Sequence, residues 1–595
     1  MKPDYKVVDS FLGINKSSTE TLLELGEASD MTNWMVTDDR KLQKIFGYIH
    51  MNDKVAGQKI NGMWYGPLNG VNYLVYARGG KVYKYDFDNK VEIDIGTVVD
   101  AYPTTFFVTN NTVYIMDGTE FYSWDTTTFQ QVDGYVPTVL TAAPPFGGGT
   151  MLESMNYITG KKKINFSPDG EAFTFQLPEY DIDSIESVTL GGEEQEEGTD
   201  YTIDLTNGKV IFPEAPTAGV NSLVIEWKKE DEELRKRITN CRRYGGMYYA
   251  RHWIFGNPGC RNTRFPSGVT KAGVSDPTYW PMYTDSNVGE YEITDIITQY
   301  DKQLVFTSGD SSGASAWYST SETFTDPNSG LITTIFPTFP INAKVGNVAP
   351  GQVQLITNNP FTLWKGVYQW VSTYVMNEKN AQWISQRIQR DLDTLDLSKA
   401  ITWDWEDKGL YLLCIGKRIW VYNYRVDVWY VLELAHEPTC FITVGKQLCF
   451  GTTDGQIMKF DENAATFDGE EIVATWDMGY HAFGTDYIRK FIQMMFISLK
   501  PFISTHVDIY LSTDRNAAWR YIKTVSYGLS SFENWDFSNF SFQTNFSPQP
   551  KKVKLKAKKI DYLKIRLVCG GTDGATVLSI TLPTRTGGIV KNREG

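Results

Sequence analysis

A serine framed by glycines is the first candidate for chemistry in this sequence. Residues 309–313 read Gly-Asp-Ser-Ser-Gly and satisfy the G-x-S-x-G pattern of serine hydrolases, with Ser311 in the nucleophile position. Such a nucleophile needs a strand before it, a helix after it and a histidine that accepts the hydroxyl proton. The five histidines, which show no recognisable partner pattern, are His50, His252, His436, His481 and His506. Because residues 314–320 favour a second strand in place of that helix, we expect a hairpin turn and no catalysis by Ser311.

Metal, cofactor and nucleotide patterns are missing from the sequence. It contains no HExxH pair, no EF-hand loop, no Walker A motif and no dinucleotide-binding glycine pattern. Acidic residues are numerous, which leaves a carboxylate pair for glycoside hydrolysis open, but no particular pair stands out. The six cysteines, none of which forms a CxxC pair, are expected to be small buried apolar residues: Cys241, Cys260, Cys414, Cys440, Cys449 and Cys569. We expect no cofactor, no bound metal and no enzymatic activity.

One segment resembles a motif of sialidase-like propellers. Residues 512–519 read Ser-Thr-Asp-Arg-Asn-Ala-Ala-Trp and are similar to the Asp box, with Asn516 where glycine is usual and Ala518 where threonine is usual. An Asp box is a structural turn away from the active site, so the resemblance does not imply hydrolysis. We expect a turn between two strands.

One basic segment could bind a partner. Residues 551–559 read KKVKLKAKK, and in a strand their alternation gives one apolar and one cationic face. The cationic face consists of Lys552, Lys554, Lys556 and Lys558. Two interpretations stay open: a solvated face that prevents aggregation at a sheet edge, or a docking strip for an acidic neighbouring subunit. Nucleic-acid binding is a third, less favoured one, because no aromatic platform or base-reading motif accompanies the lysines.

The composition predicts β-structure and an acidic surface. Aromatic residues make up 14% of the 595 residues and there are 50 glycines, a combination that suits strands and the turns between them. The net charge of −14 argues against wrapping of nucleic acid by the whole chain, although DNA could pass close by. No run of 18 apolar residues and no signal-peptide pattern are found, so we expect synthesis in the cytoplasm and no membrane span.

A recurring hairpin is the main architectural signal. Four segments share an apolar strand, a tight turn with glycine, and a strand that ends in an aromatic residue and Asp or Asn: 73–86, 112–125, 409–423 and 447–461. Looser copies lie at 246–265, 302–320 and 353–371. A single hairpin is only marginally stable in water, and radial stacking buries the faces of repeated hairpins. The repeats therefore predict an all-β fold built on a β-propeller of six to eight blades.

Two stretches break the hairpin pattern. Residues 161–227 contain alternating strands around Asn207-Gly208, a type I′ turn signal, and predict an inserted small β-sandwich after the glycine-rich linker 144–149. Strands beyond residue 468 predict a C-terminal β-sandwich, and an apolar stripe predicts a helix over 380–395. The expected domains are 1–145 with the N-terminal segment and first blades, 157–228 as the insertion, 238–467 with the remaining blades, and 468–595 as the C-terminal sandwich.

Several phrases resemble the tail nozzle, or stabilisation, proteins of short-tailed bacteriophages. In many phage structural proteins a "GGLN…GEA…N…KRxGY" phrase precedes a propeller, and this chain has a similar opening in 11–15, 25–28, 33–34 and 44–48. Leu12 departs from the first glycine of that phrase, and Ile45-Phe46 departs from its arginine. Later similar phrases are 418–424, 450–455 and 556–560.

This resemblance implies a non-enzymatic virion protein of the phage tail. It implies a homohexameric ring below the portal and adaptor that retains packaged DNA, conducts it during ejection and does not bind it specifically. Other tail proteins, and tail fibres at the inserted domain, would be its partners.

Two alternatives stay open. One is a tail fibre or adhesin that grips host glycan, with sugars stacking on Trp403, Trp405, Trp429 or Trp535, although such aromatics more often pack inside blades. The other is a glycoside hydrolase on the same propeller.

Overall fold

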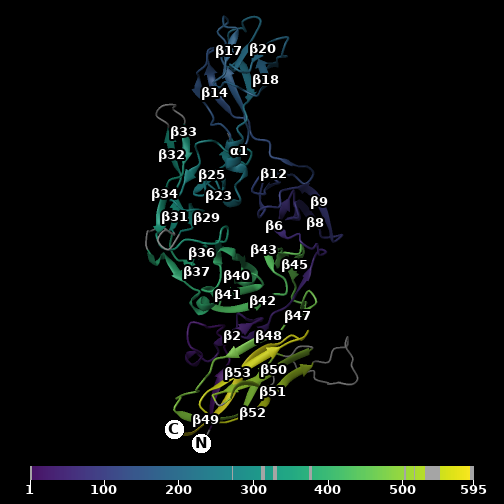
Figure 1. Cartoon of the computed structure of the whole chain (residues 1–595), viewed down its shortest axis with the longest axis vertical. Helices are drawn as coiled ribbons and strands as arrows, with labels where there is room; N and C mark the ends of the chain where they lie inside the picture. Colours follow the sequence, from purple (N-terminus) through teal and green to yellow (C-terminus); the bar gives the residue numbers. More distant parts are fainter. Residues whose placement is uncertain are drawn as a thin grey trace.

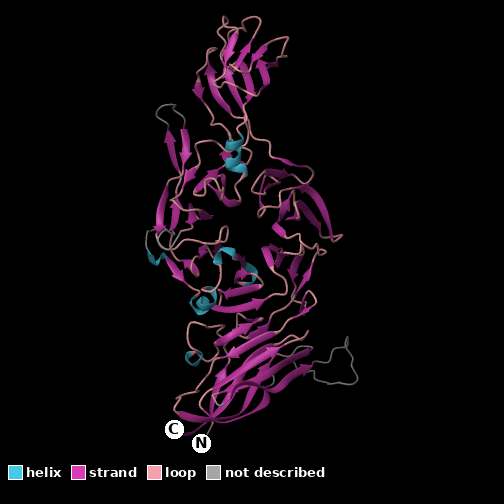
Figure 2. Cartoon of the chain, in the orientation of Figure 1, coloured by secondary structure: helices cyan, strands magenta, loops and turns pink. Residues whose placement is uncertain are grey.

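The computed structural model describes residues 3–270, 272–309, 315–325, 332–373, 378–500, 504–514, 516–528, 548 and 550–589. In these residues β-strands predominate, and the α-helices are α1 (Glu232–Thr239) and the short α2 (Gln389–Leu392). The inserted sandwich, a ring of sheets and the C-terminal sandwich follow one another along the long axis (Figures 1 and 2). None of the helices described is long and apolar enough to span a membrane.

Within the described residues, seven sheets, each antiparallel through its four blade strands, surround a common centre and form a seven-bladed β-propeller (Figure 2), which confirms the expected fold class. The first strand of each sheet is innermost, since these strands together line one central cavity. Blades 1 to 3 consist of β6 (Ile60–Leu68), β7 (Val71–Arg78), β8 (Lys81–Asp86) and β9 (Val91–Thr97); β10 (Thr105–Thr109), β11 (Thr112–Met116), β12 (Phe121–Trp124) and β13 (Phe129–Gln131); and β23 (Arg243–Tyr248), β24 (Arg251–Phe255), β25 (Thr263–Pro266) and β28 (Ser286–Asn287).

The remaining blades follow in chain order. Blades 4 to 6 consist of β29 (Ile293–Gln299), β30 (Lys302–Thr307), β31 (Ser315–Ser319) and β34 (Thr338–Asn342); β35 (Gln354–Ile356), β36 (Asn359–Leu363), β37 (Val367–Trp370) and β38 (Ala381–Trp383); and β39 (Ile401–Trp405), β40 (Leu410–Ile415), β41 (Arg418–Asn423) and β42 (Val428–Glu433). Blade 7 consists of β43 (Pro438–Val444), β44 (Gln447–Thr452), β45 (Ile457–Phe460) and β5 (Tyr48–His50), extended by β46 (Thr466–Phe467) and β47 (Glu470–Glu471).

A strand from the N-terminal region closes the ring. Strand β5 precedes blade 1 in the chain, yet it pairs antiparallel with β45 of blade 7, with Tyr48 opposite Phe460. Tyr48 is fully buried and its ring stacks on Phe467 at a centroid distance of 4.7 Å. The propeller is therefore held shut by hydrogen bonds and aromatic packing between its two chain ends.

The recurring hairpins are the blades, as predicted. The four strongest repeats form the second and third strands of blades 1, 2, 6 and 7, and the looser copies fall in blades 3, 4 and 5. The polar residue that ends a repeat folds its side chain back onto the backbone. Asp125 accepts hydrogen bonds from the N–H groups of Thr127 and Thr128, and these bonds lower the pKa of Asp125 to about 2.

The helix predicted over 380–395 is mostly wrong. Residues 381–383 form strand β38, the outer strand of blade 5, where Trp383 lies opposite Tyr368. Apart from Asn380, which ends the 3₁₀ turn Glu378–Asn380, the helical residues are Gln386–Ile388 and α2, which bury Ile388 and Leu392. Completion of a four-stranded sheet thus prevailed over the helical spacing of the apolar residues.

The inserted sandwich begins with β14 (Thr138–Ala143), earlier than the predicted residue 157, and the predicted linker 144–149 is wrong, because it is the loop between two paired strands of this sandwich. One sheet contains β14 (Thr138–Ala143), β15 (Thr150–Met151), β16 (Lys161–Phe166), β18 (Ser184–Leu190), β19 (Glu193–Glu194) and β22 (Leu223–Lys228); the other contains β17 (Thr174–Gln176), β20 (Thr202–Asp204) and β21 (Lys209–Ile211). Between β15 and β16 the chain returns to blade 3, where the Tyr157 N–H donates to the Trp280 carbonyl at 2.9 Å. The β20–β21 hairpin has a four-residue loop in which Gly208, but not Asn207, has positive φ, so the predicted type I′ turn is wrong.

The C-terminal sandwich takes strands from both ends of the chain. One sheet contains β3 (Trp34–Val36), β4 (Leu42–Lys44), β54 (Thr576–Ile589), β49 (Ile488–Leu499) and β52 (Pro550–Ile560), with β1 (Asp4–Val8) paired to β54; the other contains β2 (Ala28–Thr32), β48 (Ala474–Met478), β53 (Leu563–Cys569), β50 (Ser504–Thr513) and β51 (Asn516–Gly528). Residues 4–44 therefore do not belong with the first blades, as the boundary at 1–145 implied. The two chain ends lie side by side (Figure 1).

Candidate functional site

Strand β52 carries the predicted cationic face. The side chains of Val553, Leu555 and Ala557 are buried in the sandwich core, which confirms the predicted alternation. The exposed side chains on the other face are those of Lys552, Lys554, Lys556 and Lys558. None of these four forms an ion pair with a described residue. They are available to a partner.

Strand β52 is also the last strand of its sheet. It pairs with β49 on one side, and the pairing shifts register where Lys556 and Lys559 adopt positive φ values of 58° and 57°. Bulges and lysines are two ways in which proteins protect an edge strand from unwanted pairing. The structure thus brings the four lysines together on an edge, and this position is compatible with both interpretations of the strip.

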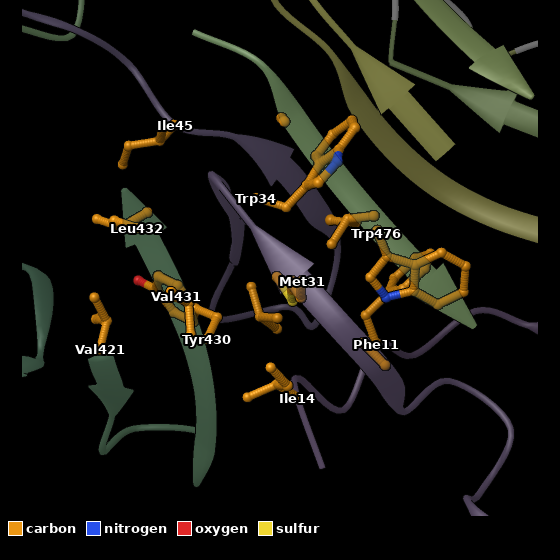
Figure 3. Close-up of a cluster of buried hydrophobic side chains, with 14 of the residues drawn as sticks. Phe11, Ile14, Met31, Trp34, Ile45, Val421, Tyr430, Val431, Leu432 and Trp476 are labelled. Carbon is orange, nitrogen blue, oxygen red and sulfur yellow. The ribbon is translucent and has the colours of Figure 1, made fainter. Parts of the chain in front are cut away.

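The N-terminal phrase lies where the propeller meets the C-terminal sandwich. Phe11 and Trp476 are fully buried and make an edge-to-face contact at 5.4 Å, and Trp34 lies beside them (Figure 3). Strand β42 of blade 6, which carries Tyr430 and Val431, lies across from this cluster (Figure 3), and both residues belong to the same buried core. One continuous apolar core therefore joins the two units.

Hydrogen bonds of Asn33 fix this joint. Its backbone N–H donates to the Val431 carbonyl at 2.9 Å, and its side-chain amide Nδ2 donates to the Val473 carbonyl at 3.0 Å. Asn33 thereby connects blade 6 to the segment leading into β48. Gly13 has φ +75°, and a Cβ atom there would lie 2.3 Å from the carbonyl oxygen of Trp429. Glycine is required because the two backbones touch.

The innermost strands of the propeller enclose a central cavity of about 760 Å³. Most of its lining residues are uncharged, and its charged ones are Arg243, Asp295 and Lys399. Gly62 lets adjacent inner strands approach, because a Cβ atom there would lie 2.0 Å from the Thr104 carbonyl oxygen. The cavity thus has few charged side chains, while its uncharged polar lining residues include Asn61, Gln352 and Thr402.

Asp295 is the buried carboxylate of this cavity. It accepts hydrogen bonds from the N–H groups of Ile296 at 2.9 Å and Val353 at 2.6 Å, which links blade 4 to blade 5. Burial raises the pKa of Asp295 to about 7, although these N–H donors and the charge of Arg243 favour ionisation. Nothing in the local sequence distinguishes Asp295, since its burial depends on the neighbouring blade.

Of the candidates for catalysis, the structure describes the histidines but not Ser311. Ser311 lies outside the described residues, but strand β31 follows its motif in place of a helix, as predicted. His252 is buried beside the Tyr244 hydroxyl at 2.9 Å, and burial lowers the pKa of His252 to about 4. His50 pairs with Asp468 on blade 7, far along the chain from any serine motif. Within the described ranges, no group of three or more His, Cys, Asp or Glu residues could hold a metal.

Two of the four aromatic candidates are buried, and a third, Trp403, is half-buried and lines the central cavity. Trp405 and Trp429 are buried in blade 6 and its core, and Trp403 donates to the Thr443 hydroxyl at 3.1 Å, whereas Trp535 lies outside the described residues. The Asp-box-like segment forms the turn between β50 and β51, as predicted. Asp514 in that turn accepts two backbone hydrogen bonds from residues 561–562.

Comparisons with known proteins give no functional assignment. No protein-family model and no curated protein matches the chain. Similar solved structures include the computationally designed Ika8 protein (9% identity, 70% of this chain and 99% of that chain covered, TM-score 0.33) and BamB from Moraxella catarrhalis (11%, 78% and 97%, TM-score 0.31). A chain of the Mitotic Checkpoint Complex is similar at 8% identity, 77% and 92% coverage and a TM-score of 0.30. These scores are too low to support an argument, so the fold assignment rests on the sheets themselves.

Proposed function

We propose that this chain is a structural subunit of a bacteriophage tail. Six copies form a nozzle ring below the portal and adaptor, retain the packaged DNA and conduct it during ejection. The protein acts in the virion, without a catalytic step and without specific contacts to DNA. The inserted sandwich, which projects from the propeller, would present a surface to tail fibres (Figure 1).

The observation that carries this proposal is the buried position of the N-terminal motif. The residues that resemble the phage proteins, among them Phe11, Gly13, Asn33 and Trp34, are buried at the joint of the propeller and the C-terminal sandwich. They specify how two units are held together and contribute no reactive group to a cavity. A phrase of this kind supports an architectural role.

Charge distribution offers a way to form the ring. The chain has a net charge of −14, yet the edge strand β52 presents four exposed lysines. A ring repeats one contact between two unlike surfaces, and a cationic strip against an acidic neighbour supplies such a contact. A channel without basic stripes would not hold the DNA backbone during ejection.

The first test is the mass of the assembled protein. Analytical ultracentrifugation and electron microscopy of the purified chain, alone and with its portal and adaptor proteins, should show six-fold rings. Failure to form rings under both conditions would refute the nozzle proposal. A trimer retained on a glycan array would instead indicate an adhesin, and release of reducing sugar in a hydrolysis screen would indicate a glycosidase.

The second test concerns the strip itself. Replacing Lys552, Lys554, Lys556 and Lys558 by Glu should reduce ring formation while leaving the circular dichroism and the melting temperature nearly unchanged. The matched control replaces four exposed propeller lysines, Lys59, Lys90, Lys365 and Lys446, by Glu, and it should assemble normally. Normal rings from the β52 variant would show that the strip is only a solvated face.

A further inference from the structure

A second cavity, of about 310 Å³, opens beside the central one. It lies where the innermost strands begin, and it shares Pro103, Arg243 and Pro350 with the central cavity. Its charged lining residues are Arg242, Arg243, Arg261 and Glu292. Three arginines therefore border a small space in a protein that is acidic overall.

Neighbouring residues hold two of these arginines in place. The guanidinium carbon of Arg242 lies 3.6 Å from the centre of the Tyr102 ring, a stacked arrangement. Gly351 has φ +70°, and a Cβ atom there would lie 3.2 Å from Cδ and Nη1 of Arg243. Gly256, at φ +80°, borders the other side of Arg243, with a Cβ position 3.4 Å from its Cγ. The side chain of Arg243 thus runs between two glycines.

The positive charge of the cavity is not neutralised by salt bridges. Among the described residues, no carboxylate forms an ion pair with Arg242, Arg243 or Arg261. The Arg242 Nε atom is buried and lacks a hydrogen-bond partner there. Burying a cation without a counter-ion is costly, so such a cluster favours binding of an anion.

Two acidic residues oppose this charge. Glu292 lines the cavity, and Asp295 interacts with Arg243 across the adjoining space. The Asp295 carboxylate already accepts two backbone hydrogen bonds, and burial raises its pKa to about 7, so near neutrality it carries only part of a charge. Three arginines against these two groups leave a positive cavity.

We propose that this cavity binds a small oxyanion of the phosphate class, either free phosphate or a small phosphomonoester. Arg242 and Arg243 bind the oxygens through their forked N–H groups, and the more exposed Arg261 closes the rim. Guanidinium groups suit this role because they present several donors in the geometry of a phosphate. A volume near 300 Å³ is at the lower end of small-molecule sites, which favours a compact anion.

The test measures the melting temperature against inorganic phosphate, with chloride adjusted to constant ionic strength. Phosphate should stabilise the wild-type protein in a saturable way. The variants Arg243→Gln and Arg242→Gln should bind phosphate at least tenfold more weakly. The control Arg390→Gln, exposed on α2, should bind phosphate as tightly as wild type. Arg261→Gln at the exposed rim should weaken phosphate binding about threefold. Because Arg261 is exposed, this variant can still test the proposal if an inner variant fails to fold. A parallel titration with phenyl phosphate separates the two sources, since tighter binding than inorganic phosphate indicates a monoester.

Three outcomes would overturn the proposal. The first is that phosphate does not raise the melting temperature of wild type in a saturable way. The second is that phosphate raises the melting temperature of wild type and of all arginine variants equally. The third is that the protein retains a DNA oligonucleotide but its melting temperature responds to neither phosphate nor phenyl phosphate. The last result would indicate a nucleic-acid contact instead. None of these results depends on ring formation, so the anion site and the nozzle proposal can fail separately.

Discussion

The two β-sandwiches are attached to the same propeller in different ways. The C-terminal sandwich shares one continuous buried core with blades 5 to 7, in which Trp34, Tyr430 and Trp476 belong to the same cluster. The inserted sandwich has its own core, which includes Phe166 and Trp227, and Met155 packs between it and the propeller. The comparison indicates that continuity of buried apolar surface decides which units unfold together.

The largest expected effect comes from breaking the shared core. Trp476→Ala removes a fully buried side chain between the propeller and the C-terminal sandwich and should cost about 3–5 kcal/mol of unfolding free energy. Hydrogen exchange should increase in both units together, because they share the core. An increase confined to the sandwich would contradict the idea of a single cooperative body.

The matched variant in the inserted sandwich is Trp227→Ala. Trp227 is also fully buried, and its indole N–H donates to Glu179 at 2.8 Å, so a local loss of about 3–5 kcal/mol is expected. Hydrogen exchange should increase within residues 138–228 and stay unchanged in the blades. Loss of protection across the propeller would show that the inserted unit is coupled to it after all.

A pair of glycine variants compares the joint of the C-terminal sandwich with a loop of the inserted sandwich. Gly13→Ala should cost about 3 kcal/mol, because it combines positive φ with a Cβ atom 2.3 Å from the Trp429 carbonyl oxygen. Gly148→Ala, in the loop between β14 and β15 of the inserted sandwich, has positive φ and open space around it, so about 1 kcal/mol is expected. Denaturant titrations of both variants measure the difference, and equal losses would disprove the close contact at Gly13.

The pH dependence of the unfolding free energy tests the buried carboxylate Asp295 of the propeller. Burial raises the pKa of Asp295 from 3.8 to about 7, so the folded state keeps a proton that the unfolded chain releases. The stability linked to this group is fully present below about pH 4 and is lost as the pH rises through 7, by on the order of 1–4 kcal/mol. Asp295→Asn should flatten the curve of unfolding free energy between pH 4 and 8, and parallel curves for variant and wild type would refute the assignment.

The smallest effect is expected at Ser311. Its motif connects β30 to β31 in blade 4, so Ser311→Ala should leave the melting temperature and the assembly unchanged. Labelling with a fluorophosphonate, using heat-denatured protein as the control, checks the chemistry. Rapid labelling of Ser311 in the folded protein would overturn the prediction that it is not a nucleophile.

Local sequence determined the repeated units of this protein. The blade hairpins, the Asp125 turn and the apolar face of β52 follow from alternation with period two and from turn residues, which act over a few neighbouring positions. Local sequence also argued against an active site. The GDSSG motif is not followed by a helix pattern, and the five histidines show no partner pattern. These signals need no knowledge of distant partners.

Tertiary structure alone decided which strands meet. Strand β5 completes blade 7, residues 4–44 join the C-terminal sandwich, and Ala381–Trp383 becomes a strand, because each buries its side chains against elements far away in the chain. The same holds for Asp295 and for the arginines of the second cavity, whose surroundings come from several blades. Alternation specifies that a face will be buried but not against which strand, and that choice depends on the packing of the whole molecule.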